Sequence, residues 1–136
     1  MESRHVSRVI SASPHTVYEL AANIDTLPKW ASGLAHSEVT RDGDTLWVDS
    51  PMGRVSVRFA APNEFGILDH DVTLPSGVTV TNPLRVVSHP DGAEIIFTVR
   101  RLDLTDDEFD RDATTVGEDL DRLRALVEDE NRASRS

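Results

Sequence analysis

The chain has 136 residues, no cysteine and a formal net charge of −10. This length suits one domain with a core that needs no disulfides, and the lack of cysteine excludes thiolate nucleophiles and thiolate metal sites. The acidic excess disfavours nucleic acid and anionic lipid as partners. Because no apolar run approaches the ~18 residues of a membrane helix and charges interrupt the N-terminal residues, we expect a cytoplasmic protein without membrane insertion.

The N-terminal part is expected to form one strand followed by two short helices. Residues 4–10 alternate between apolar and polar side chains and contain β-branched residues, which predicts a strand. Ser13 followed by Pro14 is typical of a helix N-cap and first helical position, so a helix is predicted from there to about Asn23. Residues 25–31 are predicted as a second short helix or turn.

Six further strands are predicted between residues 35 and 101. Turn signals such as Asp42-Gly43 separate them, and these short connections indicate an antiparallel meander. Pro83 predicts a bulge or a sheet edge in the fifth of the six, because proline cannot donate a ladder hydrogen bond. The six ranges are Ala35–Arg41, Thr45–Asp49, Arg54–Ala61, Ile67–Leu74, Val78–Ser88 and Ala93–Arg101.

A long amphipathic helix is predicted at the C-terminal end. Thr105 and Glu108 have the spacing of a capping box, and residues 131–136 are expected to fray. The apolar stripe of this helix consists of Phe109, Ala113, Val116, Leu120, Leu123 and Val127. A helix with one apolar stripe and a sheet with one apolar face bury each other. We therefore predict a single α+β domain over residues 1–136, a helix-grip fold with a curved seven-stranded antiparallel sheet around the C-terminal helix and two short helices after the first strand.

Four segments carry a resemblance to a known superfamily. They are I-S-A-S-P-H-T-V-Y-E-L (Ile10 to Leu20), L-P-K-W (Leu27 to Trp30), N-E-F-G-I-L-D-H-D-V-T-L-P (Asn63 to Pro75) and D-L-D-R-L-R-A-L-V-E (Asp119 to Glu128). With the order of the elements, they make the chain resemble the START and birch-pollen-allergen helix-grip superfamily (SRPBCC), in its bacterial polyketide cyclase/dehydratase-like branch. The resemblance implies a cavity for an apolar small molecule between the sheet and the C-terminal helix. No single catalytic motif is shared by the cyclases, lipid carriers, hydroxylase subunits and co-chaperones of that superfamily, so it assigns no catalytic residue here.

His70 is the first candidate for chemistry. In a regular strand it shares a face with Leu68 and Val72, while Asp69 and Asp71 face the other way. An inward imidazole in a partly apolar cavity has a pKa suited to a general acid or base. The alternative is a core histidine that is hydrogen-bonded to a neighbouring strand or helix.

Asn82 and Arg85 are candidates for ligand binding. The parity of the strand places Asn82 on the apolar face, where its amide can bind a ligand carbonyl or hydroxyl. A bulge at Pro83 reverses the parity and directs Arg85 inward, where it can anchor a carboxylate or enolate. The alternative is a bulge satisfied by Asn82, with Arg85 in solvent.

Aromatic residues of the two short helices are further candidates for a ligand site. Tyr18 and Trp30 lie where the small helices of the superfamily border the cavity, so the resemblance implies that either can line its entrance. For Tyr18, packing in the core or on the surface is the alternative. His36 and Glu38 share a strand face, but no third ligand accompanies them. We therefore expect no metal and no cofactor.

Three functions compete. The first is a protein that binds an apolar, ring-bearing small molecule or lipid in the cavity between the sheet and the helix. The second is a polyketide cyclase or dehydratase in which His70 transfers protons and Asn82 or Arg85 stabilises an enolate. The third is an interaction module with a filled core. The sequence leaves a monomer and a homodimer equally open.

Overall fold

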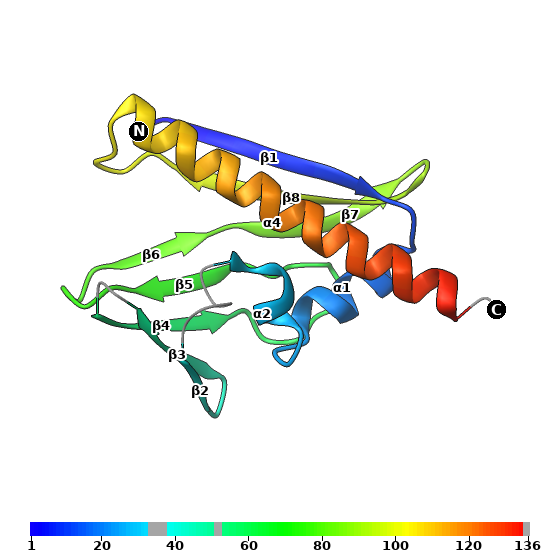
Figure 1. Cartoon of the computed structure of the whole chain (residues 1–136), viewed down its shortest axis with the longest axis horizontal. Helices are drawn as coiled ribbons and strands as arrows, with labels where there is room; N and C mark the ends of the chain where they lie inside the picture. The colour runs from blue at the N-terminus through cyan, green and yellow to red at the C-terminus, as the bar shows by residue number, and fades with distance from the viewer. Residues whose placement is uncertain (33–37, 51–52, 135–136) are drawn as a thin grey trace.

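The computed structural model describes residues 1–32, 38–50 and 53–134. Across these ranges the chain forms eight strands in antiparallel pairs and a long C-terminal helix, so the predicted α+β helix-grip fold is confirmed (Figure 1). The elements are β1 Ser3–Ile10, α1 Pro14–Ala22, α2 Leu27–Trp30, β2 Glu38–Asp42, β3 Thr45–Ser50, β4 Gly53–Phe59, β5 His70–Thr73, β6 Thr79–Asn82, β7 Leu84–His89, β8 Gly92–Arg100 and α4 Asp106–Ala133.

The strands form two hydrogen-bonded groups that continue into each other. One group has the order β1-β8-β7, and the other follows the chain from β2 to β6. The segment before β5 joins them, because the N–H of Leu68 donates to the carbonyl of Leu84 (2.8 Å) and the N–H of Val86 donates to the carbonyl of Gly66 (2.9 Å). The result is one bent surface that encloses an inner side (Figure 1).

The strand expected from Val78 to Ser88 is interrupted at Pro83, which accounts for eight strands where seven were predicted. β6 ends before the proline and β7 begins after it, because proline has no N–H to continue the ladder. Even-numbered residues nevertheless face the inner side both before and after the break. Asn82 pairs with His70 on one side, and Leu84 and Val86 are buried on the other.

Helix α4 crosses the inner side of the sheet and packs most closely on β1 (Figure 1). The predicted capping box is present, since the Thr105 side chain accepts the N–H of Glu108 and the Glu108 carboxylate accepts the N–H of Thr105. Its predicted stripe faces the core, with Gly117 also buried and Val116 partly exposed. The helix continues to Ala133, so residues 131–133 of the tail expected to fray are helical. No described helix is long and apolar enough to span a membrane.

Two ion pairs from the inner face of β1 join that strand to α4. The guanidinium of Arg4 lies 2.7 Å from the Asp110 carboxylate, and that of Arg8 lies 2.7 Å from Asp121. The register partners of Arg4 and Arg8 in β8 are the buried residues Val99 and Ile95. The arginine side chains therefore start on the core side of β1, and their long aliphatic parts carry the guanidinium groups out to the helix.

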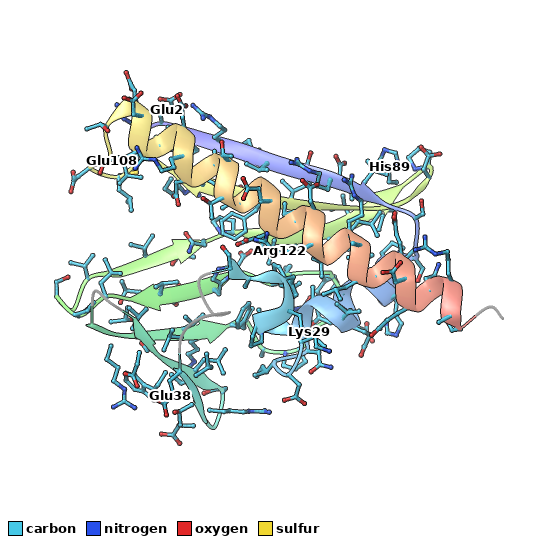
Figure 2. The ribbon with its side chains drawn as sticks, viewed as in Figure 1. Glu2, Lys29, Glu38, His89, Glu108 and Arg122 are labelled. Atoms are coloured by element: carbon cyan, nitrogen blue, oxygen red, sulfur yellow. The ribbon has the colours of Figure 1, made fainter. Side chains whose placement is uncertain are left out.

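The two short helices close one end of the inner side. Ser13 caps α1 by accepting the N–H of Thr16, as predicted. Helix α1 buries an apolar face in the core, and α2 buries Leu27 and Trp30. Arg122 of α4 lies against α2, where its Nε donates to the carbonyl of Trp30 at 3.2 Å (Figure 2). The small helices are thereby fixed to the long one.

Candidate functional site

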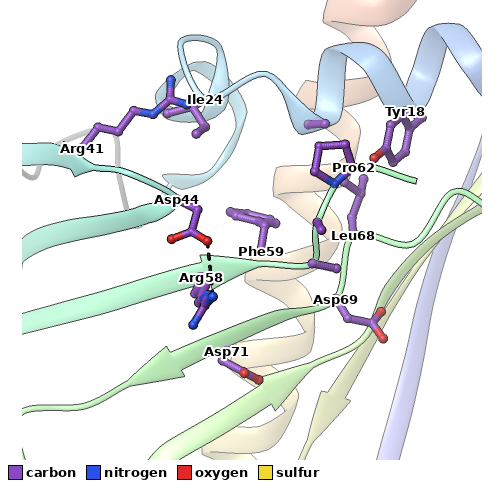
Figure 3. Close-up of a pocket in the computed structure, with 13 residues that line it drawn as sticks. Tyr18, Ile24, Arg41, Asp44, Arg58, Phe59, Pro62, Leu68, Asp69 and Asp71 are labelled. Carbon is purple, nitrogen blue, oxygen red and sulfur yellow. Dashed lines mark hydrogen bonds and ion pairs between the residues drawn. The ribbon is translucent and has the colours of Figure 1, made fainter. Parts of the chain in front are cut away.

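A pocket of about 630 Å³ lies between α1, the β2–β3 hairpin turn and the end of β4. Figure 3 shows Phe59 at its centre, Tyr18 and Pro62 at one end, and Ile24 and Arg41 at the other. None of the described residues that line it belongs to α4. The pocket therefore lies closer to the first helix than the position expected between the sheet and the C-terminal helix.

Apolar side chains from three segments form the pocket wall. Ile24 follows α1, Phe59 is the last residue of β4, and Leu68 precedes β5 and is only 2% exposed. Phe59 points inward because it continues the alternation that places Val55 and Val57 on the core side. This arrangement provides an apolar surface that is open at one end, where a flat ring can lie.

Tyr18 lines the pocket from α1. Its hydroxyl accepts the N–H of Asn63 at 3.1 Å, which fixes the ring against the loop that follows β4. Tyr18 also lines a second hollow of about 480 Å³, next to which Phe65 is 78% exposed. The ring thus forms a wall between the two hollows.

Charged groups surround the mouth of the pocket. Arg58 and Asp44 form an ion pair at 3.3 Å (Figure 3), and Asp71 accepts the Thr81 hydroxyl at 2.5 Å. Arg41 Nε donates to the carbonyl of Gly43 at 3.1 Å, and no described carboxylate pairs with its guanidinium. Within the described ranges, the guanidinium of Arg41 is therefore a cation at the mouth that no acidic side chain neutralises.

His70 contacts Phe59 and Leu68, two residues of the pocket wall. Its ring centroid is 4.9 Å from that of Phe59 and 5.7 Å from that of Phe97, and its Nδ1 lies 3.1 Å from the carbonyl oxygen of Leu68. Burial lowers the pKa of His70 below 6.5, although the Leu68 carbonyl and the flanking aspartates act in the opposite direction. Burial thus favours the neutral imidazole, and the ring faces inward, on the side that the parity of the strand predicted.

Asn82 lies opposite His70 in the neighbouring strand. The two are register partners, so their side chains share the inner face of the sheet. Asn82 is partly buried, and no hydrogen bond joins its amide to another residue in the described part of the chain. The structure thus brings together two of the polar residues singled out from the sequence.

Arg85 lies outside this cluster. Because the parity does not reverse at Pro83, its side chain is on the outer face, where it forms two hydrogen bonds with Asp69. The inward direction considered for Arg85 is therefore wrong, and the alternative with the arginine at the surface describes it. Arg85 is not among the described residues that line either hollow.

Trp30 is part of the core and lines neither pocket. It is 4% exposed, and its buried Nε1 has no hydrogen-bond partner among the residues that the structure describes. His36, one of the two residues weighed as metal ligands, lies outside the described residues. Within the described ranges no three His, Cys, Asp or Glu side chains are grouped as metal ligands would be.

Phe59, Leu68, Ile24 and Arg41 belong to the pocket, although the sequence did not single them out. The alternation in β4 and before β5 indicated that Phe59 and Leu68 face inward. That pattern cannot separate a residue beside an open space from one in a filled core, because both are apolar and inward.

Comparisons with known proteins concern the whole chain. A family model described as "Polyketide cyclase / dehydrase and lipid transport" matches residues 1–128. The search of curated proteins gave no match. Among solved structures, the chain is similar to the Aha1 dimer from Colwellia psychrerythraea, with a TM-score of 0.74, 16% identity and coverage of 94% of this chain and 97% of that one.

Two further solved structures have the same fold. The Zhui aromatase/cyclase from Streptomyces sp. R1128 has a TM-score of 0.68 and 16% identity, with 98% of each chain covered. Ara h 8.0201 has a TM-score of 0.66 and 12% identity, with 93% of this chain and 97% of that one covered. At these identities the similarity concerns the fold.

Proposed function

Since the chain belongs to the polyketide cyclase, dehydrase and lipid transport family, we propose that it binds an apolar, ring-bearing small molecule in the pocket between α1 and the sheet. The observation that carries this proposal is the pocket of about 630 Å³. Pockets for small organic ligands have volumes of roughly 300–1,000 Å³ and mostly apolar walls. An interaction module with a filled core has no such space.

The wall of the pocket supports a ligand with a ring. Phe59 and Tyr18 present two aromatic side chains, and aromatic rings pack on each other in offset or edge-to-face geometry. Tyr18 is held by Asn63 and Phe59 is packed against His70, so both rings have fixed places before a ligand arrives. Preorganised walls lower the entropic cost of binding.

Native mass spectrometry of gently purified protein, followed by denaturing extraction, tests the proposal with the natural ligand. A near-stoichiometric apolar molecule is the expected result. Titration with 8-anilinonaphthalene-1-sulfonate tests it in parallel with a defined ring-bearing probe. Saturable fluorescence at one site per chain is expected.

A variant that fills the pocket makes this test specific. Ala22 lies in the pocket wall at the end of α1 and is exposed. Ala22→Phe is expected to weaken probe binding by about tenfold or more, since the new ring occupies the space of the ligand. Ala125→Phe places the same ring on an exposed position of α4 outside the pocket and serves as the matched control. Equal probe affinity in both variants would overturn the proposed site.

A further inference from the structure

We propose that the pocket selects ring-bearing molecules that carry a carboxylate, and that the guanidinium of Arg41 binds this carboxylate. The ring then lies against the apolar wall, and the carboxylate lies at the end of the pocket where Arg41 and Ile24 are found (Figure 3). The inference rests on the proposed function, because it concerns which molecules the same site holds.

The place of Arg41 in the sheet is the first step. Arg41 is the register partner of Leu46 in β3, and Leu46 is the register partner of Val57 in β4. Side chains at paired positions lie on the same face of a sheet, and Leu46 is 1% exposed in the core. The Arg41 side chain therefore starts on the inner face, the face that also presents Phe59 to the pocket. Its long aliphatic part carries the guanidinium from there to the mouth.

The hydrogen bond of Arg41 is the second step. Its Nε donates to the carbonyl of Gly43 at 3.1 Å, in the turn between β2 and β3. Within the described ranges this is the only hydrogen bond of the guanidinium, so Nη1 and Nη2 keep their N–H groups available. Two N–H groups of a planar guanidinium match the two oxygens of a carboxylate. The bond to Gly43 thus leaves the end of the group open to a bidentate partner.

The other charges around the pocket are the third step. The charged side chains among the described residues that line it are Arg41, Asp44, Arg58, Asp69 and Asp71. Asp44 is paired with Arg58 at 3.3 Å, and Asp69 is paired with Arg85 at 2.7 Å. Figure 3 shows Asp71 beyond the pair of Asp44 and Arg58, away from Arg41. A carboxylate on the ligand would therefore be the acidic partner that Arg41 lacks in the described part of the chain.

The net charge of the chain makes a preference for an anion a local effect. The formal charge of −10 repels an anion at long range. A neutral molecule of the same shape is therefore favoured unless a cation contacts the anion directly. Tighter binding of the anion would indicate a cation such as Arg41 at the site itself.

2-Naphthoic acid and 2-naphthamide test the inference, because they share one ring system and nearly one shape, and only the acid is ionised at about pH 7.5. Their affinities for the wild-type protein are measured by equilibrium dialysis, with the absorbance of the ring as the signal. We expect the acid to bind about fivefold more tightly or better at low ionic strength, as a bidentate ion pair at an exposed arginine provides. The preference is expected to decrease as salt is added.

Two variants connect the preference with Arg41. In Arg41→Gln we expect the acid and the amide to bind within about twofold of each other, since glutamine has neither the charge nor the fork of the guanidinium. Arg54→Gln is the matched control, because it removes the same charge from a position of β4 that lies over Trp47 and does not line the pocket. It is expected to keep the preference for the acid. If Arg41→Gln also keeps it, the role of Arg41 is overturned.

The outcomes separate this inference from the proposed function. If the wild-type protein binds the acid and the amide equally well, the selection of a carboxylate is overturned and the apolar site stands. If neither probe binds, both are overturned. Ala22→Phe is expected to weaken both probes in parallel, and unchanged binding would place the probes outside the pocket and overturn both. The comparison of the two probes uses wild-type protein alone, so a variant that fails to fold does not remove the test.

Discussion

Asp69 holds Arg85 by two parallel hydrogen bonds on the outer face of the sheet. Oδ1 accepts from Nε at 2.8 Å and Oδ2 from Nη2 at 2.7 Å, and Oδ1 also accepts the N–H of Leu84 at 3.0 Å. The guanidinium beside it lowers the pKa of the Asp69 carboxyl below 3.8. One carboxylate therefore connects the segment before β5 to the first residue of β7, directly after the break at Pro83.

This connection makes Asp69 more important for stability than an ordinary surface acid. Asp69→Ala is expected to lower the free energy of unfolding by about 1–2 kcal/mol, because it leaves the Leu84 N–H and the guanidinium without their acceptor. Asp44→Ala removes only the exposed ion pair with Arg58 and is expected to cost less than about 0.5 kcal/mol. Urea denaturation of both variants measures the difference. Equal losses would contradict the role assigned to Asp69.

Gly66 is expected to tolerate no side chain. Its φ is +73°, and a Cβ added there would lie 2.2 Å from the backbone oxygen of Val86. Gly66→Ala is therefore expected to lower the unfolding free energy by more than about 2 kcal/mol. Gly43 has a similar φ of +62° with nothing within 4 Å, so Gly43→Ala should cost only the conformational strain, about 1 kcal/mol. Thermal and urea denaturation of the two variants separate the clash from the strain, and similar losses would show that Val86 is not the obstacle.

The lowered pKa of His70 makes stability depend on pH in a defined direction. Because the folded-state pKa lies below 6.5, the unfolded chain binds more protons there, and the unfolding free energy falls as the pH is lowered through 6.5. The fall ends below the folded-state pKa. In His70→Phe this contribution is absent. From about pH 8 to about pH 5, the unfolding free energy of the wild type should therefore fall relative to that of the variant. A difference that is constant with pH would mean that burial does not perturb His70.

The capping box at the start of α4 is expected to contribute measurably to folding. Thr105→Ala removes the acceptor of the Glu108 N–H, and an exposed N-cap of this kind is worth about 1 kcal/mol. Thr114→Ala changes the same residue type in the exposed middle of the helix, where the hydroxyl donates to the Asp110 carbonyl. There alanine is the better helix former, so no loss is expected. Circular dichroism during urea titration provides the measurement, and a loss in both variants would argue against a specific effect of the cap.

The fold followed from local patterns in the sequence. The Ser13-Pro14 start, the Thr105–Glu108 box and the apolar stripe beginning at Phe109 each express a short-range rule of helix formation, and each is present. The inward direction of His70 and Asn82 followed in the same way from the alternation of side chains in a strand. These rules need only neighbours within a few residues, which a single sequence contains.

The direction of Arg85 and the location of the pocket were decided by the tertiary structure. Whether Pro83 reverses the parity depends on which strands pair on each side of it, and here Leu68, Gly66 and Asp69 bind β7 in a register that keeps it. Trp30 and Phe59 are both large, apolar and inward, yet one is packed in the core and the other borders an open space. Packing of segments far apart in the chain determines where a volume stays unfilled, and local periodicity contains no information about that volume.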